Sequence, residues 1–97
     1  MNFIFKSTGQ YFGFIADDYL FSRDGEYLGW IEGKYAWDKS GLFRGIVTDD
    51  KRYIVRNIYT ILPVPRAPRP HPSTPSLPTP QANIASIVLP VGYIDAF

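Results

Sequence analysis

Residues 3–50 read FIFKSTGQYFGFIADD, YLFSRDGEYLGWIEGK and YAWDKSGLFRGIVTDD, three consecutive segments of 16 residues that share one pattern. Each segment has an aromatic residue at its first, third and ninth positions. Glycine stands at the seventh and eleventh positions, and an aliphatic residue stands at the thirteenth. A fixed period of this kind is typical of a repeat architecture, in which every segment is one supersecondary unit.

Each unit reads as a β-hairpin. A short run of β-prone residues leads into a polar turn that ends in glycine: Gly9, Gly25 and Gly41. Hairpin loops need a positive φ near their end, which glycine adopts without steric cost. A second strand follows, and polar residues at 16–18, 32–34 and 48–50 predict reverse turns into the next unit.

The eleventh-position glycines, Gly13, Gly29 and Gly45, fall inside the second strands. A glycine in mid-strand marks a bend or a close backbone approach. Alternation along a strand predicts that the ninth, eleventh and thirteenth positions share one face. We interpret the glycines as making room for an aromatic side chain of a neighbouring hairpin, so that the hairpins converge on an axis.

The fourth unit is interrupted. Its first strand begins at Tyr53, but the turn glycine is missing and a proline-containing segment follows. Near the end of the chain, Gly92-Tyr93-Ile94-Asp95 matches Gly13-Phe14-Ile15-Ala16. This match predicts that the second strand resumes at Val91–Ile94 and closes the ring against the first unit.

The predicted fold is therefore all-β, with four β-hairpins in a pseudo-four-fold arrangement closed by the C-terminal strand. We expect a single domain over residues 1–97, with repeats at 3–18, 19–34, 35–52 and 53–62 plus 84–97. A long Pro-rich loop, residues 63–83, is inserted in the fourth hairpin. The alternative is an open, SH3-like barrel of three hairpins with a loose tail, against which the terminal G-Y-I-D motif argues.

Three GxxxGxI-type hairpins, a Tyr-led strand, a Pro/Arg-rich stretch and a terminal G-Y-I-D resemble the bacterial four-fold beta flower proteins. The resemblance covers essentially the whole chain and implies four hairpins in a pseudo-four-fold array. It implies no activity and carries no functional residues over to this sequence.

Composition excludes several function classes. The net charge is +1 with both signs interspersed, so we expect no nucleic-acid partner. There is no cysteine, which excludes disulfides and thiolate metal sites. The N-terminal residues do not read as a signal peptide, and no apolar stretch is long enough to span a bilayer. We expect a cytoplasmic protein with no membrane partner.

The Pro-rich segment carries PxxP spacings, with Arg66 and Arg69 beside the pair formed by Pro65 and Pro68. Prolines at this density favour an extended polyproline-II conformation, which docks into aromatic grooves of peptide-binding domains. These four residues are therefore candidates for binding a partner. A stiff or disordered spacer is the simpler interpretation, and a third is that the loop covers the chain's own β surface.

No catalytic constellation is found. The single histidine, His71, lies among prolines, where a general base is poorly held. The pairs Asp17-Asp18 and Asp49-Asp50 read as turn formers rather than metal ligands. We expect no catalytic residue, metal or cofactor, and the chain is interpreted as not being an enzyme.

Aromatic residues are the plentiful resource, at 16% of the chain. Most are expected to fill the core. The twelfth-position residues Phe14, Trp30 and Tyr93 could instead face outward as an apolar patch that supports self-association. Trp30 and Tyr93 join the candidate partner-binding residues. The sequence leaves the biochemical function unknown and favours a non-catalytic interaction or structural module presenting the Pro/Arg-rich loop, with small-ligand or glycan binding through an aromatic β surface as the alternative.

Overall fold

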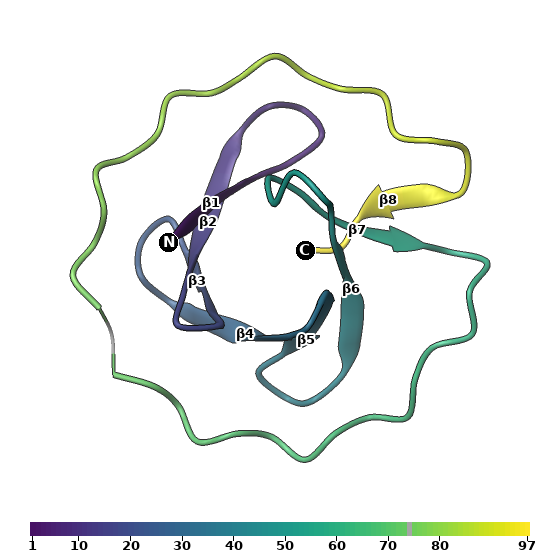
Figure 1. The fold of residues 1–97 in the computed structure, drawn as a ribbon, viewed down its shortest axis with the longest axis horizontal. Helices are drawn as coiled ribbons and strands as arrows, with labels where there is room; N and C mark the ends of the chain where they lie inside the picture. The colour runs from purple at the N-terminus through teal and green to yellow at the C-terminus, as the bar shows by residue number, and fades with distance from the viewer. Residues whose placement is uncertain (74) are drawn as a thin grey trace.

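Eight antiparallel strands follow one another in chain order in a single curled sheet (Figure 1). The structure, a computed structural model, describes residues 1–73 and 75–97, and none of these is helical. The all-β prediction is confirmed. The strands are β1 (Asn2–Phe5), β2 (Tyr11–Ala16), β3 (Tyr19–Ser22), β4 (Tyr27–Glu32), β5 (Tyr35–Asp38), β6 (Phe43–Val47), β7 (Ile54–Asn57) and β8 (Tyr93–Asp95).

The tip of each of the first three hairpins turns on its predicted glycine. Gly9, Gly25 and Gly41 have φ values of 90°, 89° and 92°, a region that other residues rarely adopt. The first connection between hairpins is the two-residue turn Asp17-Asp18, and both residues have positive φ. This is the pattern of a type I′ turn, whose twist matches that of the flanking strands.

The mid-strand glycines admit a main-chain carbonyl. A Cβ atom on Gly29 would lie 1.9 Å from the carbonyl oxygen of Trp37, and one on Gly13 would lie 2.1 Å from that of Phe21. Close approach of the next hairpin was the correct expectation. We expected an aromatic side chain to fill the space beside these glycines, but a backbone carbonyl oxygen fills it.

A β-bulge in each second strand changes which side chains share a face. In β4, Gly29 pairs with Leu20 and Tyr27 pairs with Phe21, so Leu28 is an extra residue. The same shift occurs between β1 and β2 and between β5 and β6. The extra residue moves the ninth position onto the face of the twelfth. The prediction that positions nine, eleven and thirteen share a face is therefore wrong for position nine.

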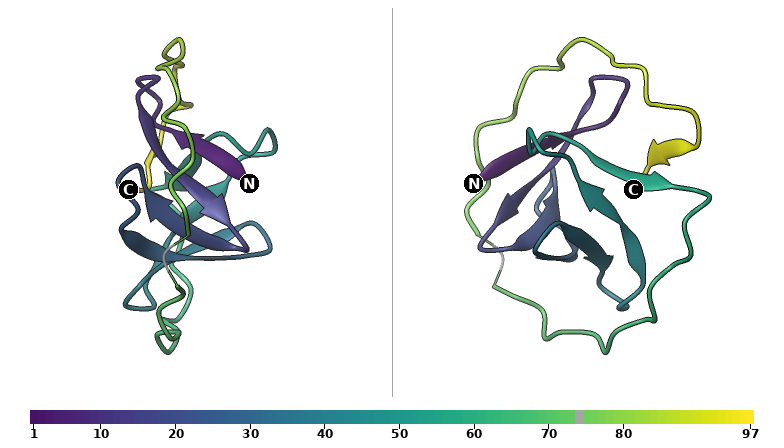
Figure 2. Two further views of the ribbon diagram at one scale, coloured as in Figure 1. Left: turned by 90° about the vertical axis from the view of Figure 1, so that its left-hand side faces the viewer. Right: turned by 45° about the vertical axis from the view of Figure 1, so that its right-hand side comes forward.

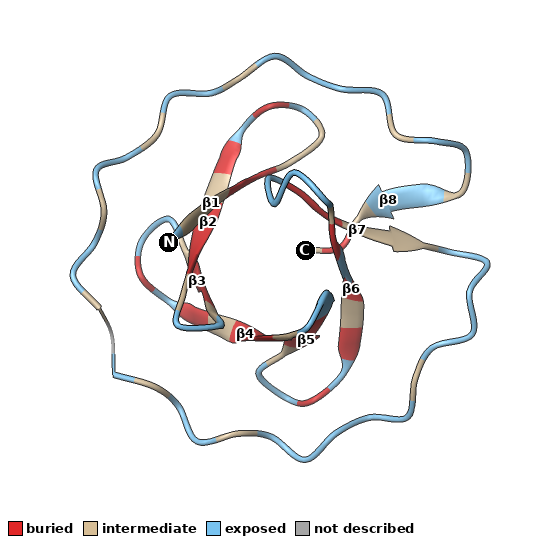
Figure 3. Ribbon diagram, viewed as in Figure 1, coloured by how far each residue is buried: buried red, intermediate tan, exposed pale blue. Residues whose placement is uncertain are grey.

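Two kinds of core result from the two faces of the sheet. The buried residues lie in the hairpins and at the C-terminal end, and the described residues between β7 and β8 are intermediate or exposed (Figure 3). One face of every hairpin contributes to a central aliphatic cluster, whose buried members are Ile4, Ile15, Leu20, Ile31, Ala36, Val47, Ile54 and Ala96. The other face builds aromatic seams between neighbouring hairpins. Phe14 stacks on Phe21 with ring centroids 5.4 Å apart, and Trp30 stacks on Trp37 at 6.3 Å.

The fourth hairpin is paired four residues away from the predicted register. Val55 pairs with Asp95, and the Ala96 N–H donates to the Ile54 carbonyl at 3.0 Å. Ala96 thus takes the place of the mid-strand glycine, while Gly92, with φ of 89°, takes that of the tip glycine. Tyr93 is correspondingly not a twelfth-position residue.

The ring closes at the C-terminal strand through a side chain. Between the first two hairpins, the Arg23 N–H donates to the Phe12 carbonyl at 3.0 Å. At the closing seam the equivalent donor is Ser7, whose N–H and hydroxyl donate to the two carboxylate oxygens of Asp95 at 2.9 and 2.8 Å. In the described part of the chain no backbone ladder joins β8 to β1, and these two strands are the edges of the sheet.

Residues 58–92 join β7 to β8, and we call them the strap. All nine prolines lie in it, and none of its described residues belongs to a strand. It runs round the outside of the hairpins along the rim of a disc with extents of 36 × 35 × 18 Å (Figures 1 and 2). Residue 74, inside the predicted 63–83 loop, lies outside the described residues.

Candidate functional site

The strap is tied to the tips of the hairpins by main-chain hydrogen bonds. The Arg66 N–H donates to the Gly41 carbonyl and the Ile84 N–H donates to the Gly9 carbonyl, both at 2.8 Å. A Cβ atom on either glycine would lie 1.8 Å from a strap carbonyl oxygen. The tip glycines therefore serve two purposes, because the turn and the strap both need them.

Two strap arginines lie on the two tryptophans of the chain. The Arg66 guanidinium is 4.9 Å from the centroid of the Trp37 ring, and the Arg69 guanidinium is 4.9 Å from that of Trp30. Both tryptophans are 1% exposed. Polyproline II repeats every three residues, so residues 66 and 69 point to the same side of the strap. Cation–π contacts of this kind contribute about 0.5–2 kcal/mol each.

Glu32, at the end of β4, holds both arginines. Arg66 Nη1 donates to its two carboxylate oxygens at 2.9 and 2.8 Å, and Arg69 Nη2 donates at 3.1 Å. The side chains are 40–48% exposed, so each ion pair contributes at most about 1 kcal/mol. The pairs fix the direction of the arginines rather than the stability of the fold.

The next strap residue in contact with the sheet is His71. Its ring centroid is 4.8 Å from that of Tyr27, the first residue of β4. Burial raises the pKa of the Tyr27 hydroxyl, and Tyr19 raises it further, while the charge of Arg69 lowers it; the net direction is upward. We call the surface formed by Tyr27, Trp30, Glu32 and Trp37 the tryptophan seam.

Three polar atoms of the tryptophan seam are buried without a hydrogen-bond partner among the described residues. They are the Tyr27 hydroxyl and the indole Nε1 atoms of Trp30 and Trp37. A buried donor without a partner costs about 1–3 kcal/mol. The strap therefore stacks on the rings of the tryptophan seam but leaves its hydrogen-bonding groups unused.

The structure brings together three of the six predicted site residues: Trp30, Arg66 and Arg69. Pro65 and Pro68 flank the arginines and are exposed. Tyr93 lies in β8 opposite Asn57, away from the tryptophan seam.

The predicted outward patch is wrong for Phe14 and Trp30, which are 0% and 1% exposed, whereas Tyr93 is exposed at 38%. Both buried rings lie on the face opposite the central cluster, as alternation predicts, but the next hairpin covers that face: Phe14 stacks on Phe21, and Trp30 stacks on Trp37. Sequence reasoning also missed Glu32 and Trp37 as site residues, although Trp37 stands at the third repeat position and therefore borders a seam.

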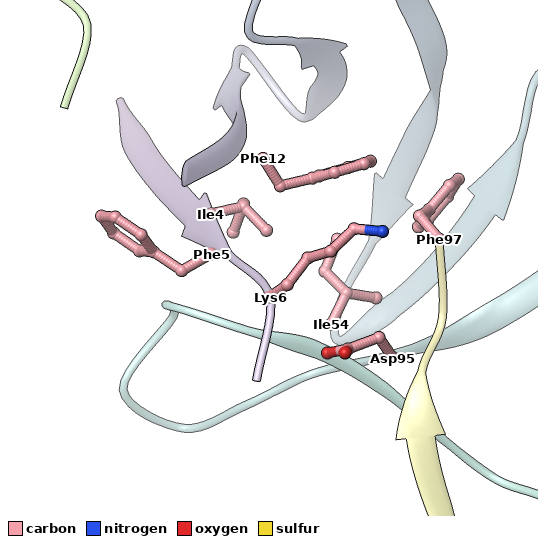
Figure 4. Close-up of a pocket in the computed structure, with 7 residues that line it drawn as sticks. All are labelled: Ile4, Phe5, Lys6, Phe12, Ile54, Asp95 and Phe97. Atoms are coloured by element: carbon pink, nitrogen blue, oxygen red, sulfur yellow. The ribbon is translucent and has the colours of Figure 1, made fainter. Parts of the chain in front are cut away.

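Further cavities lie outside the tryptophan seam. The one at the closing seam is lined by Lys6, Phe12, Asp95 and their neighbours, and its volume of about 10 Å³ suits a single water molecule (Figure 4). A second, of about 190 Å³, opens among the turns between hairpins above Ile15, Ile31 and Val47.

The described residues include no helix of the length and apolar character needed to cross a membrane.

Comparison with known proteins gives one match. The model of the family described as 4-fold beta flower protein matches residues 1–88, which include the first seven strands and most of the strap. Gly92–Asp95, part of the predicted resemblance, lie outside the match. No curated protein and no solved structure matches the chain. The family match and the four-hairpin architecture agree, and the chain belongs to the 4-fold beta flower protein family.

Proposed function

We propose that this protein is a non-catalytic interaction module whose tryptophan seam binds an extended segment rich in proline and arginine. The observation that carries the proposal is the seating of Arg66 and Arg69 on Trp37 and Trp30, with Glu32 between them. Aromatic surfaces that take preformed polyproline-II strands are a recurrent mode of peptide recognition.

The strap has the character of a displaceable occupant. Most of its described residues are exposed (Figure 3). At the tips of the first and third hairpins, one main-chain hydrogen bond from Ile84 and one from Arg66 hold it. Segments with few buried apolar contacts open at low free-energy cost. A free arm that displays its arginines to solvent is less well supported, because those arginines point to the chain's own tryptophans.

The alternative of glycan binding has less support. The groups that lie on Trp30 and Trp37 are guanidinium ions paired with Glu32, and a neutral sugar would not reproduce these contacts. A catalytic role likewise lacks a constellation: the ring of His71 stacks on Tyr27, and the described residues give it no carboxylate partner. A general base needs an orienting group within hydrogen-bond reach.

A peptide titration tests the proposal. The peptide ILPVPRAPRPHP, residues 61–72, is added to the full chain carrying Arg66→Ala and Arg69→Ala. Because both tryptophans lie at the site, their fluorescence reports binding without background from elsewhere. We expect saturable binding that is weaker in the wild-type chain, where the tethered strap competes at an effective concentration in the millimolar range.

The matched control carries Arg23→Ala and Arg52→Ala, which remove the same charge from exposed positions outside the tryptophan seam. It should behave as the wild-type chain. The proposal is wrong if the Arg66→Ala, Arg69→Ala chain keeps its β circular dichroism spectrum and its fluorescence does not respond to the peptide.

A further inference from the structure

The spacing of the two arginines is dictated by the tryptophan seam, and this observation deepens the proposed function, on which it rests. One carboxylate, Glu32, accepts from both Arg66 and Arg69. A polyproline-II strand turns once every three residues, so a spacing of three places both side chains on one side of the strand. A spacing of two would turn the second side chain away from Glu32.

The chemistry of the contacts selects arginine over lysine. Arg66 uses one nitrogen to bond both carboxylate oxygens of Glu32 while its guanidinium lies over Trp37. A planar guanidinium can stack on an indole and donate at its edge at the same time. An ammonium group is a compact, strongly hydrated charge that gains less from the ring.

A separate observation points to a ligand other than the strap. The indole Nε1 atoms of Trp30 and Trp37 and the Tyr27 hydroxyl are more than nine-tenths buried and have no partner among the described residues. Proline-rich strands keep every main-chain carbonyl as an acceptor although they lose N–H donors. A strand laid differently over the same rings can accept from both indoles, which the strap does not.

We infer that the tryptophan seam recognises a polyproline-II segment of another protein that carries two arginines three residues apart, and that its carbonyls accept from the indole N–H groups of Trp30 and Trp37. The strap carries the same motif, but its attachment to the hairpin tip at Gly41 holds it where its carbonyls do not accept from the two indoles. It keeps the rings covered until a ligand with the full set of contacts replaces it. Each hydrogen bond that the ligand gains over the strap offsets part of the advantage of the tethered strap.

The experiment compares four peptides against the full-length Arg66→Ala, Arg69→Ala chain and against the wild type. The parent is PVPRAPRPHP; the others carry lysines in place of both arginines, arginines two residues apart, or alanines in place of both. Affinity is measured by calorimetry, and the indole N–H signals are followed by ¹H–¹⁵N NMR.

We expect the parent to bind at least tenfold more tightly than each of the other three, and Glu32→Gln to weaken it by about tenfold. Both indole N–H signals should move downfield on binding. Equal affinity for the parent and for the peptide with arginines two residues apart would overturn the inferred motif while leaving the proposed function intact. Equal affinity for the parent and the alanine peptide would contradict the role of arginine in the proposed function. If none of the four peptides binds, the proposed function itself is contradicted.

Two further outcomes bear on the identity of the ligand. Indole signals that stay in place while the parent binds would contradict the inferred hydrogen bonds. Concentration-dependent dimers that the parent peptide dissociates would show that the occupant is the strap of a second copy, and would overturn the inference of a different partner. A monomer at high micromolar concentration agrees with it.

Discussion

Adding one methyl group at Gly29 would test how closely the second and third hairpins approach one another. In Gly29→Ala the new Cβ atom would meet the Trp37 carbonyl oxygen, and backbone on both sides would have to move. We expect the free energy of unfolding to fall by about 3 kcal/mol, since overpacking against fixed atoms has costs of this size. Urea denaturation followed by circular dichroism measures it.

Gly33→Ala is the matched control for this prediction. No atom lies within 4 Å of its Cβ position, but its φ is +64°, so only the backbone conformation is unfavourable. The expected loss is about 1 kcal/mol. Equal losses in the two variants would mean that close approach of the Trp37 carbonyl does not limit the eleventh position.

Asp38 links the stability of the third hairpin to pH. Burial raises the pKa of its carboxyl, but hydrogen bonds from the Ser40 hydroxyl and from the Leu42 and Ser40 amides outweigh burial, and the net direction is downward. A group with a lowered pKa stabilises the fold above its unfolded value of about 3.9. That contribution is lost as pH falls through the folded-state pKa.

Asp38→Asn should therefore be less stable than the wild type at pH 7, and the two should converge near pH 2. Urea denaturation at a series of pH values measures the difference. The control is Asp24→Asn, on the exposed tip of the second hairpin, which should stay parallel to the wild type. A gap between Asp38→Asn and the wild type that is the same at pH 7 and pH 2 would contradict the assignment.

Within the strands, the sequence predicted the hairpins well and their faces less well. The glycines at 9, 25 and 41 were correctly predicted to be turn residues, because few residues other than glycine adopt a positive φ. The sequence does not reveal the bulge at Leu28, because many residue types can occupy the extra position of a β-bulge. The face of Tyr27 could not be predicted without it.

The fourth hairpin shows why a short sequence match can predict the wrong strand register. Gly92 is followed by an aromatic and an aliphatic residue, as is Gly13, yet its φ of 89° makes it a turn glycine. Pairing is selected by the ladder and by burial of Ala96 in the central cluster. A one-letter match of four residues carries neither of these constraints.

Closure at the last strand depends on Asp95. Its carboxylate accepts from the N–H and the hydroxyl of Ser7, while a backbone bond from the Phe5 N–H to the Arg52 carbonyl at 2.7 Å joins the first hairpin to the residues before β7. Hydrogen bonds to a charged group contribute about 1.5–3 kcal/mol. Asp95→Ala should lower the free energy of unfolding by about 2 kcal/mol and speed hydrogen exchange of the Ser7 amide.

Asp95→Asn is the informative companion, because its amide oxygen can still accept from the Ser7 N–H. It should lose about half as much stability as Asp95→Ala, since the amide can still bond the N–H and the hydroxyl of Ser7 but offers no charged acceptor. Exchange of the Ser7 amide that is unchanged in Asp95→Ala would show that the edges of the sheet are held together by packing alone.

At the scale of the whole molecule, the strap spans most of the circumference of the disc. Turns occupy residues 58–60 and 91–92, and at the polyproline-II rise of about 3.1 Å per residue the length 61–90 corresponds to about 90 Å, against about 110 Å for a full circle 36 Å across. The sequence predicted the extended conformation, because proline excludes helix and central strand. Docking of the strap on the chain's own β surface was one of three interpretations, and the sequence could not choose among them because docking depends on where four hairpins place their tips around an axis.

A strap with so little slack should tolerate added length and not tolerate lost length. Deleting residues 76–78 removes about 9 Å of reach. The strap must then release either the contact of Ile84 with Gly9 or that of the arginines with the tryptophans. We expect a lower melting temperature and, where the arginine end is released, red-shifted tryptophan fluorescence. Duplicating the same three residues is the control, since lengthening a loop of this size by three costs about 0.1 kcal/mol. If the deletion melts at the temperature of the duplication and retains the wild-type emission spectrum, the strap has slack and its length does not determine how it covers the tryptophan seam.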